Sequence, residues 1–210
     1  MLAPNEKDDT GIEFYRMPVH QYKGCYIGFL WIYHNITSSK NPESRGWDQT
    51  IDCQLDFSWD GKRWIRVSDR QTFMSKGQPG DWDELEVHPT GMINRNNEIW
   101  IYYGGSFSGH GHRFSDSRST LVKGRTVVGG IGLDKLRMEG FVSVRAGQQE
   151  GAMITRVIEF RDRRRLIVNA SAKGGYVIAE VLDRFGKPLA GYGRQDCIPL
   201  EGDFLKFEIN

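Results

Sequence analysis

The stretch Ile51–Ser58, with the sequence IDCQLDFS, decides the fold class because it strictly alternates apolar and polar residues. Successive side chains of a β-strand point to opposite faces, so this pattern predicts a strand with one apolar and one polar face. The next residues, Trp59–Lys62 (WDGK), predict a tight turn, since Asp-Gly suits the positive φ angles of a hairpin. Arg63–Val67 then predicts the returning strand.

The rest of the chain repeats this theme. Helical periodicity is almost absent, and short runs rich in β-branched and aromatic residues alternate with clusters of Gly, Asp, Asn, Ser and Pro. Strands are predicted at Ile12–Met17, Tyr26–His34, Ile51–Ser58, Trp64–Val67, Leu85–His88, Glu98–Tyr103, Val128–Leu133, Phe141–Val144, Ala152–Phe160, Arg165–Ala172, Tyr176–Asp183 and Phe204–Ile209. The sequence therefore predicts an all-β protein.

A weak internal repeat suggests how these strands are organised. Gly28–Tyr33 (GFLWIY) recurs as Glu98–Tyr103 (EIWIYY), an offset of about 70 residues with several strands per unit, which is of the β-propeller type. We expect residues 1–146 to form a partial β-propeller of about two blades. The character changes near Gly147, and residues 147–210 show strand–turn–strand patterns that predict part of an antiparallel β-sandwich.

Composition and charge exclude several classes of function. Lys plus Arg number 28 against 27 Asp plus Glu, so a net charge of +1 gives no field to attract nucleic acid. The longest apolar run, Gly28–Tyr33, is too short to span a bilayer, so no membrane partner is expected. The three cysteines form no CxxC pair, and no nucleotide-binding motif is present, so neither a metal nor another cofactor is expected.

Two segments carry a resemblance to a known family. Ser58–Trp64 (SWDGKRW) resembles the S-x-D-G-x-x-W hairpin of five-bladed propeller glycosidases. Asp81–Pro89 (DWDELEVHP), followed by Ile99–Gly105 (IWIYYGG), resembles another blade of the same proteins. The chain is similar to the C-terminal half of the group called glycosyl hydrolase family thirty-two N-terminal-like, akin to families thirty-two and forty-three. The resemblance implies a propeller followed by a β-sandwich, with further blades expected before this point.

Glycoside hydrolysis uses two carboxyl groups that flank the scissile bond, so the acidic residues of the second segment are the catalytic candidates. Asp83 matches the family's W-D motif, and Glu84 is the second candidate. Glu84, Glu86 and His88 alternate onto one face if the strand is regular, which places Asp83 on the other. The competing interpretation is that Asp83 caps a turn and the glutamates are surface residues.

Other residues are candidates for contacting a sugar. His88 and His110 are predicted to bind substrate, His110 because the family's matching blade has a similar glycine–histidine loop. A metal at His110 and His112 would need a third ligand, and none is evident. Asp52 and Gln54 resemble a D-x-Q pattern in the family, although tying strands together is an equal alternative. Three tryptophans could stack on a sugar, with core packing as the alternative: Trp31, Trp47 and Trp82. The predicted substrate-binding residues are His88, His110, Asp52, Gln54 and Trp82.

The sequence therefore predicts a glycoside hydrolase-like protein that acts on a polysaccharide or oligosaccharide, as a fragment of a longer enzyme that supplies the missing carboxylate. The alternative is a non-catalytic carbohydrate-binding or structural β module. The N-terminal stretch MLAPNEKDD has neither the basic nor the apolar region of a signal peptide, so a secreted or periplasmic location would require a leader in a longer parent.

Overall fold

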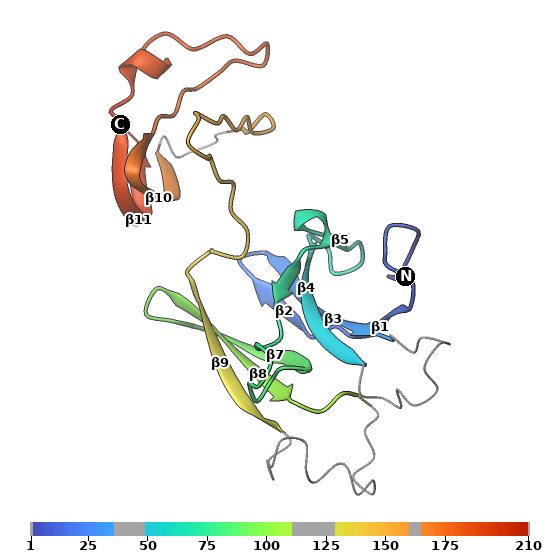
Figure 1. Ribbon diagram of the computed structural model, residues 1–210. Helices are drawn as coiled ribbons and strands as arrows, with labels where there is room; N and C mark the ends of the chain where they lie inside the picture. The colour runs from blue at the N-terminus through green and yellow to red at the C-terminus, as the bar shows by residue number, and fades with distance from the viewer. Residues whose placement is uncertain (1, 36–48, 111–128, 160–164, 210) are drawn as a thin grey trace, which may run out of the picture. The chain divides into compact units, whose positions relative to one another are not determined.

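A computed structural model of the chain describes residues 2–35, 49–110, 129–159 and 165–209 (Figure 1). The prediction of an all-β protein is confirmed, because the described residues contain strands, turns and two short 3-10 segments but no α-helix. The 3-10 segments are η1 (Ser68–Arg70) and η3 (Arg194–Asp196). The chain divides into two compact units, Met1–Leu136 and Arg137–Asn210, so the change predicted near Gly147 falls inside the second unit.

The first unit holds one open sheet. Its strands are β1 (Ile12–Arg16), β2 (Val19–Tyr22), β3 (Cys25–His34), β4 (Thr50–Ser58), β5 (Ile65–Arg66), β6 (Thr72–Met74), β7 (Glu86–Arg95), β8 (Glu98–Ser106) and β9 (Gly129–Arg137). The main order is β1-β3-β4-β7-β8-β9; β2 also pairs with β3, while β5 and β6 also pair with β4. The two copies of the predicted repeat lie in β3 and β8. Strands β2 and β6 were not predicted from the sequence.

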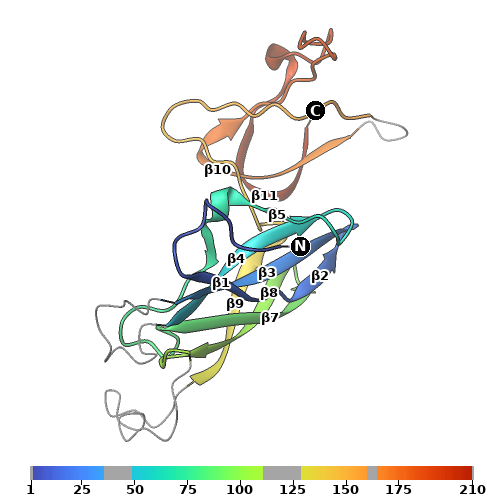
Figure 2. The ribbon, with the colours of Figure 1, turned by 90° about the vertical axis from the view of Figure 1, so that its right-hand side faces the viewer.

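The sheet has two parts that meet at a single parallel pair. Strands β1 to β6 form one antiparallel part around β3 and β4, and β7 to β9 form the other. Between them the ladder holds only the pair Ile51↔Glu86, reinforced by a backbone hydrogen bond of 3.1 Å from Ile51 N to Leu85 O. Figure 2 shows β7 and β8 running across the β3–β4 part. The junction therefore places the start of β7 beside the centre of the first part.

The core of this unit is built from β3 and β4. Phe29, Ile32 and Ile51 are completely buried, and Trp31 and Tyr33 are nearly so. Both β3 and β4 are buried on both faces: β3 fills these faces with apolar side chains, whereas one face of β4 carries buried polar side chains. The predicted turn after β4 is confirmed: Asp60 Oδ1 accepts hydrogen bonds of 2.8 Å from the backbone N–H groups of Lys62 and Arg63, and β5 returns along β4.

The second unit holds one antiparallel pair, β10 (Leu166–Val177) with β11 (Leu200–Ile209). The strands predicted at Phe141–Val144 and Ala152–Phe160 are wrong where the structure describes these residues. Of the strand predicted at Tyr176–Asp183, the structure retains the end of β10 and an isolated bridge between Leu182 and Pro188. The segments wrongly predicted as strands are rich in apolar residues, which suit strands. A strand also needs a neighbouring strand to pair with, and residues in these segments such as Ile154 are exposed.

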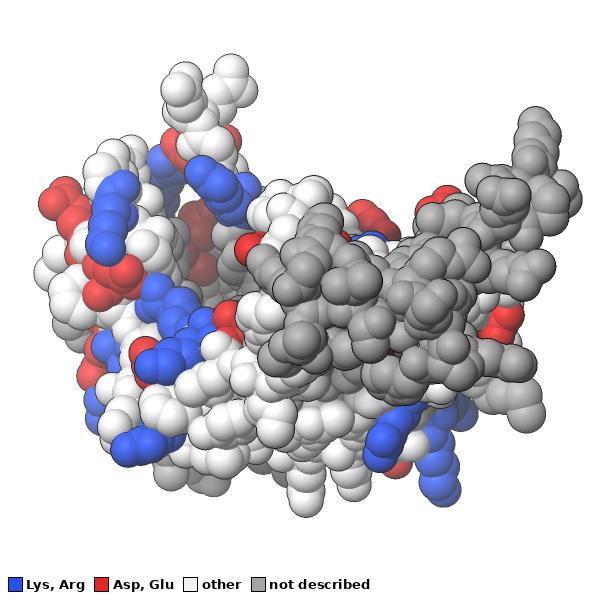
Figure 3. Space-filling model, turned by 60° about the horizontal axis from the view of Figure 1, so that its bottom comes forward, with Lys and Arg blue, Asp and Glu red and all other residues white. Residues whose placement is uncertain are grey.

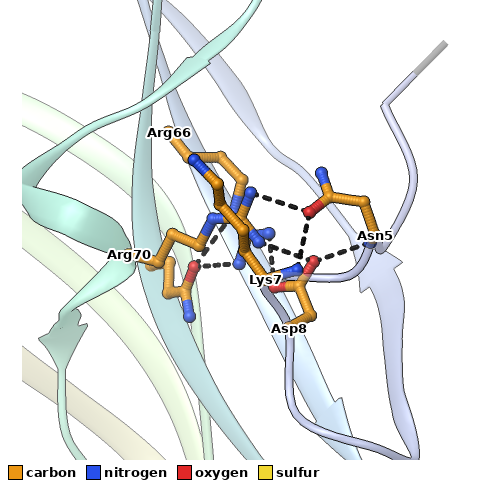
Figure 4. A network of polar contacts seen from close by, with 6 residues as sticks. Asn5, Lys7, Asp8, Arg66 and Arg70 are labelled. Carbon is orange, nitrogen blue, oxygen red and sulfur yellow. Dashed lines mark hydrogen bonds and ion pairs between the residues drawn. The ribbon is translucent and has the colours of Figure 1, made fainter.

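One face of β4 carries a buried polar network (Figure 4). Arg66 on β5 donates to Gln54 Oε1 from Nε at 3.1 Å and pairs with Asp8 Oδ1 at 2.5 Å. Arg70 pairs with the other Asp8 oxygen at 2.9 Å and donates to Asn5 at 3.0 Å. Because both arginines are mostly buried, their charges need these partners, and the network ties the N-terminal segment to the β4–β5 hairpin.

Asp56, on the same face of β4, is buried without such partners. Its side chain is completely buried, and neither carboxylate oxygen has a hydrogen-bond partner in the described structure. Burial raises the pKa of Asp56 from 3.8 to about 7, although Arg66 and Arg70 oppose the rise. The folded state therefore holds this proton more tightly than the unfolded state. Its stabilising contribution is complete below the unfolded pKa and is lost as pH rises toward 7.

We predict that Asp56→Asn increases stability at pH 8 relative to the parent chain, and that this advantage is larger than at pH 5 by about 1–3 kcal/mol. Asparagine cannot ionise, so it avoids the buried charge at high pH. Urea unfolding at the two pH values measures the difference. Asp60→Asn is the control, because exposed Asp60 accepts backbone hydrogen bonds that lower its pKa, and its loss should give no gain at pH 8. An identical effect of Asp56→Asn at both pH values would contradict the prediction.

Candidate functional site

The candidate site lies where β7 crosses the first part of the sheet. Strand β7 pairs regularly with β8 at its start, Glu86 opposite Ser106 and His88 opposite Gly104. Glu86 and His88 therefore share one face of β7, as the alternation predicted, and Val87 and Pro89 share the other. The cross-strand partners on the Glu86 face are a serine and a glycine, which leave space for the longer side chains.

Three titratable side chains converge there, and we call Glu86, His88 and His110 the acid–histidine cluster. Glu86 Oε2 lies 3.6 Å from His88 Nε2, and Glu86 Oε1 lies 3.5 Å from His110 Nδ1. The Glu86 side chain is only 8% exposed, whereas those of His88 and His110 are 23% and 32% exposed. Glu86 Oε1 is buried and makes no hydrogen bond within the described structure. The carboxyl group thus lies at the base of the cluster, with the imidazoles toward solvent.

An aromatic wall of Tyr15, Trp31 and Tyr33 borders the cluster. The Trp31 ring lies 4.7 Å from the His88 ring, and Tyr33 meets His110 edge-on at 5.4 Å. Tyr15 also meets the His110 ring edge-on, at 4.6 Å. Trp31 is fixed in place by a hydrogen bond of 3.0 Å from its Nε1 to the Pro89 carbonyl oxygen. These rings provide a rigid apolar border beside a polar centre.

The surroundings change the protonation of the cluster. Burial raises the pKa of Glu86 from 4.5 to about 7. Burial, assisted by the charge of His110, lowers the pKa of His88 from 6.5 to about 4. At neutral pH His88 is therefore uncharged, and Glu86 is divided between its protonated and ionised forms. A carboxyl group in this state can donate a proton near pH 7, as a general acid must.

The carboxylates predicted to be catalytic, Asp83 and Glu84, lie just before β7. Asp83 is buried, and its Oδ2 accepts a hydrogen bond of 2.9 Å from the Tyr103 hydroxyl. Trp82 stacks on the same Tyr103 ring at 5.7 Å. Tyr103 projects from the face of β8 opposite to Gly104, so this group lies on the other side of the strand pair from His88. Glu84 accepts a hydrogen bond from the backbone N–H of Gly80.

Asp52 and Gln54 make contacts on the polar face of β4. Asp52 Oδ2 lies 3.0 Å from His34 Nε2 on the adjacent strand β3. Gln54 accepts from Arg66 in the buried network described above. Both side chains thus make the strand-tying contacts that were the alternative to substrate binding. Trp47 and His112 lie outside the described residues.

The structure brings together His88 and His110 from the predicted substrate-binding set and adds residues that the sequence interpretation did not select. From the sequence, Glu86 is expected to share a face with Glu84 and His88 but is not among the candidate site residues, and neither are Tyr15 and Tyr33. The signal for Glu86 was present in the alternation of Glu86 with His88. The signal for Tyr33 was the alternation of β3, which places Tyr33 on the same face as the candidate Trp31.

Comparisons with known proteins add no assignment: no family model, no curated protein and no solved structure matches the chain. A search of the described residues finds no group of three or more His, Cys, Asp or Glu suited to holding a metal ion. The same residues include no helix of the length and apolar character that crossing a membrane requires. The site is therefore interpreted from its own geometry.

We predict that His110→Gln raises the pKa of His88, because it removes the positive charge that disfavours protonation of the neighbouring imidazole. The pKa should still remain below 6.5, since burial is the larger cause of its depression. Imidazole ¹⁵N chemical shifts followed through a pH titration give the value directly. His34, on the other side of β3, serves as the internal control. An unchanged or lower pKa for His88 would contradict the repulsion between the two imidazoles.

Proposed function

We propose that this chain is a glycoside hydrolase-like protein that binds a carbohydrate at the acid–histidine cluster. The observation that carries the proposal is the buried Glu86 carboxyl group beside two histidines and an aromatic wall. A sugar ring offers an apolar face to aromatic rings and hydroxyl groups to imidazoles and carboxyl groups. Hydrolysis of a glycosidic bond requires an acid of raised pKa that protonates the leaving oxygen, and Glu86 has this property.

We further propose that the first unit corresponds to two propeller blades. Its two antiparallel sheet parts are joined by one bridge, and a repeated segment lies in a central strand of each. The S-x-D-G-x-x-W hairpin and the W-D segment, which resemble blades of five-bladed glycosidases, lie at the end of β4 and before β7. The β10–β11 pair would then be part of the sandwich that follows the propeller in that family.

Within this proposal Glu86 is assigned the acid role in preference to Asp83. The Asp83 carboxylate accepts a hydrogen bond from Tyr103, whose pKa is raised to about 12 by burial and by Asp83 itself. The Tyr103 hydroxyl therefore stays protonated and donates its hydrogen bond to the Asp83 carboxylate. Asp83 and Glu84 would shape the loop that leads into β7, while Glu86 acts on the ligand.

A non-catalytic carbohydrate-binding module is the second candidate, and one observation favours it. Among the described residues, Glu86 is the one carboxylate paired with a histidine of the cluster. Hydrolysis generally takes two carboxyl groups, an acid and a base or nucleophile. A carboxylate from outside the described part would complete the pair; without one, the same cluster would bind a sugar and leave it intact.

We predict that Glu86→Gln lowers kcat/KM about 10²–10⁴-fold on the oligosaccharide that the chain hydrolyses, because glutamine cannot donate a proton. The parent's activity should decline above pH 7, as Glu86 ionises. Reducing-end release from xylan, arabinan, fructan and β-glucan oligosaccharides provides the assay, and Tyr103→Phe, on the other side of the strand pair, is the control.

Full activity in the Glu86→Gln variant would contradict the acid role. Binding without hydrolysis by both the parent and the variant would favour the non-catalytic module. Absence of both binding and hydrolysis across the four polysaccharide classes would overturn the carbohydrate proposal itself.

A further inference from the structure

Tyr15 occupies an irregular position in the edge strand β1. Phe14 lies opposite Ile32 on β3, and Arg16 lies opposite Trp31, the next residue along the partner. Two steps on β1 therefore match one step on β3, and Tyr15 is the extra residue of a β-bulge. A bulge bends its strand and re-aims the side chain of the inserted residue, and such bulges are over-represented beside active sites.

The bulge places the Tyr15 ring against His110, at the border of the acid–histidine cluster. The ring lies 4.6 Å from the His110 ring, 6.0 Å from the Tyr33 ring, and nearly parallel to the Trp31 ring at 6.5 Å. Trp31 and Tyr33 are only 6% and 8% exposed, whereas Tyr15 is 51% exposed. Of the three rings in the aromatic wall, Tyr15 is thus the one with substantial surface available to a ligand.

The charges near this ring indicate which ligands it suits. The pKa of Tyr33 is raised first by burial and then by the negative charges of Glu13 and Glu86, which therefore act on the aromatic wall. The cationic side chain on this strand, Arg16, lies over the Trp31 ring at 5.4 Å. Figure 3 shows both acidic and basic side chains on the described part of one face of the molecule. An anionic sugar would be repelled by Glu13 and by ionised Glu86, whereas a neutral sugar would not.

From the bulge, the exposure and the contact with His110, we propose that Tyr15 is a stacking platform for one ring of a neutral oligosaccharide whose next unit reaches Glu86. This inference rests on the proposed carbohydrate function and adds a specificity residue and a ligand class to it. The apolar face of the sugar ring packs on the phenol ring, and its equatorial hydroxyls point along the ring edge toward His110. Stacking depends on the aromatic face, so the tyrosine hydroxyl contributes little.

Isothermal titration calorimetry of the full chain tests the inference with three probes: xylotetraose, cellotetraose and tetragalacturonate. We expect one of the neutral tetrasaccharides to bind, and Tyr15→Leu to weaken that binding about tenfold. Tyr15→Phe should bind within about twofold of the parent, because it keeps the ring. Trp59→Ala removes another exposed ring, at the β4–β5 turn, and should bind like the parent. Circular dichroism establishes that each variant is folded.

The outcomes separate the inference from the function on which it rests. If Glu86→Ala loses affinity while Tyr15→Leu binds as the parent does, the platform is overturned and the carbohydrate site stands. Tighter binding of tetragalacturonate than of either neutral tetrasaccharide overturns the claim that the ligand is a neutral oligosaccharide. Failure of the parent to bind any of the three probes overturns the inference about Tyr15, and the function falls with it only if binding and hydrolysis are also absent across the four polysaccharide classes named above. If Tyr15→Leu is unfolded, a tenfold loss in Tyr15→Phe still overturns the platform, because stacking does not need the hydroxyl.

Discussion

The buried N–H group of Trp31 must find an acceptor, and the Pro89 carbonyl oxygen that it finds fixes the way in which the two parts of the first unit meet. The sheet ladder alone joins these parts by one parallel pair, which is a weak constraint on their angle. The indole hydrogen bond adds a second point of attachment across the face of β3. Together they hold β7 so that Glu86 and His88 point toward the aromatic side chains of β1 and β3.

The same arrangement accounts for the chemistry of the site. Closing β7 over β3 buries the Glu86 carboxyl group, and burial without a hydrogen bond to Oε1 raises its pKa. His88, 3.6 Å from Glu86, offers no positive charge at neutral pH to offset this burial, because its own pKa is lowered to about 4. Packing therefore gives the Glu86 carboxyl group a pKa of about 7, while the Asp83 carboxylate accepts a hydrogen bond from Tyr103.

Local patterns predicted the local structure, and non-local contacts explain what they missed. The alternation of Ile51–Ser58 and the Asp60-Gly61 turn predicted β4 and its hairpin, because a strand face and a tight turn depend on neighbouring residues. The alternation of β7 likewise predicted the shared face of Glu86 and His88. The approach of His110, the bulge at Tyr15 and the Tyr103–Asp83 hydrogen bond all depend on chain segments that pair across space. In the second unit, Ala152–Phe160 has the composition of a strand, but its described residues form no strand.

The most direct test of the account is an imidazole NMR titration of the intact chain with neutral tetrasaccharides. The histidines report on different places: His88 and His110 lie in the acid–histidine cluster, His34 pairs with Asp52 on the other face of β3, and His20 lies beside Phe29. If the cluster is the ligand site, the signals of His88 and His110 shift with ligand concentration while those of His34 and His20 stay in place. Shifts at His34 with His88 and His110 unmoved would place the ligand elsewhere and contradict the account.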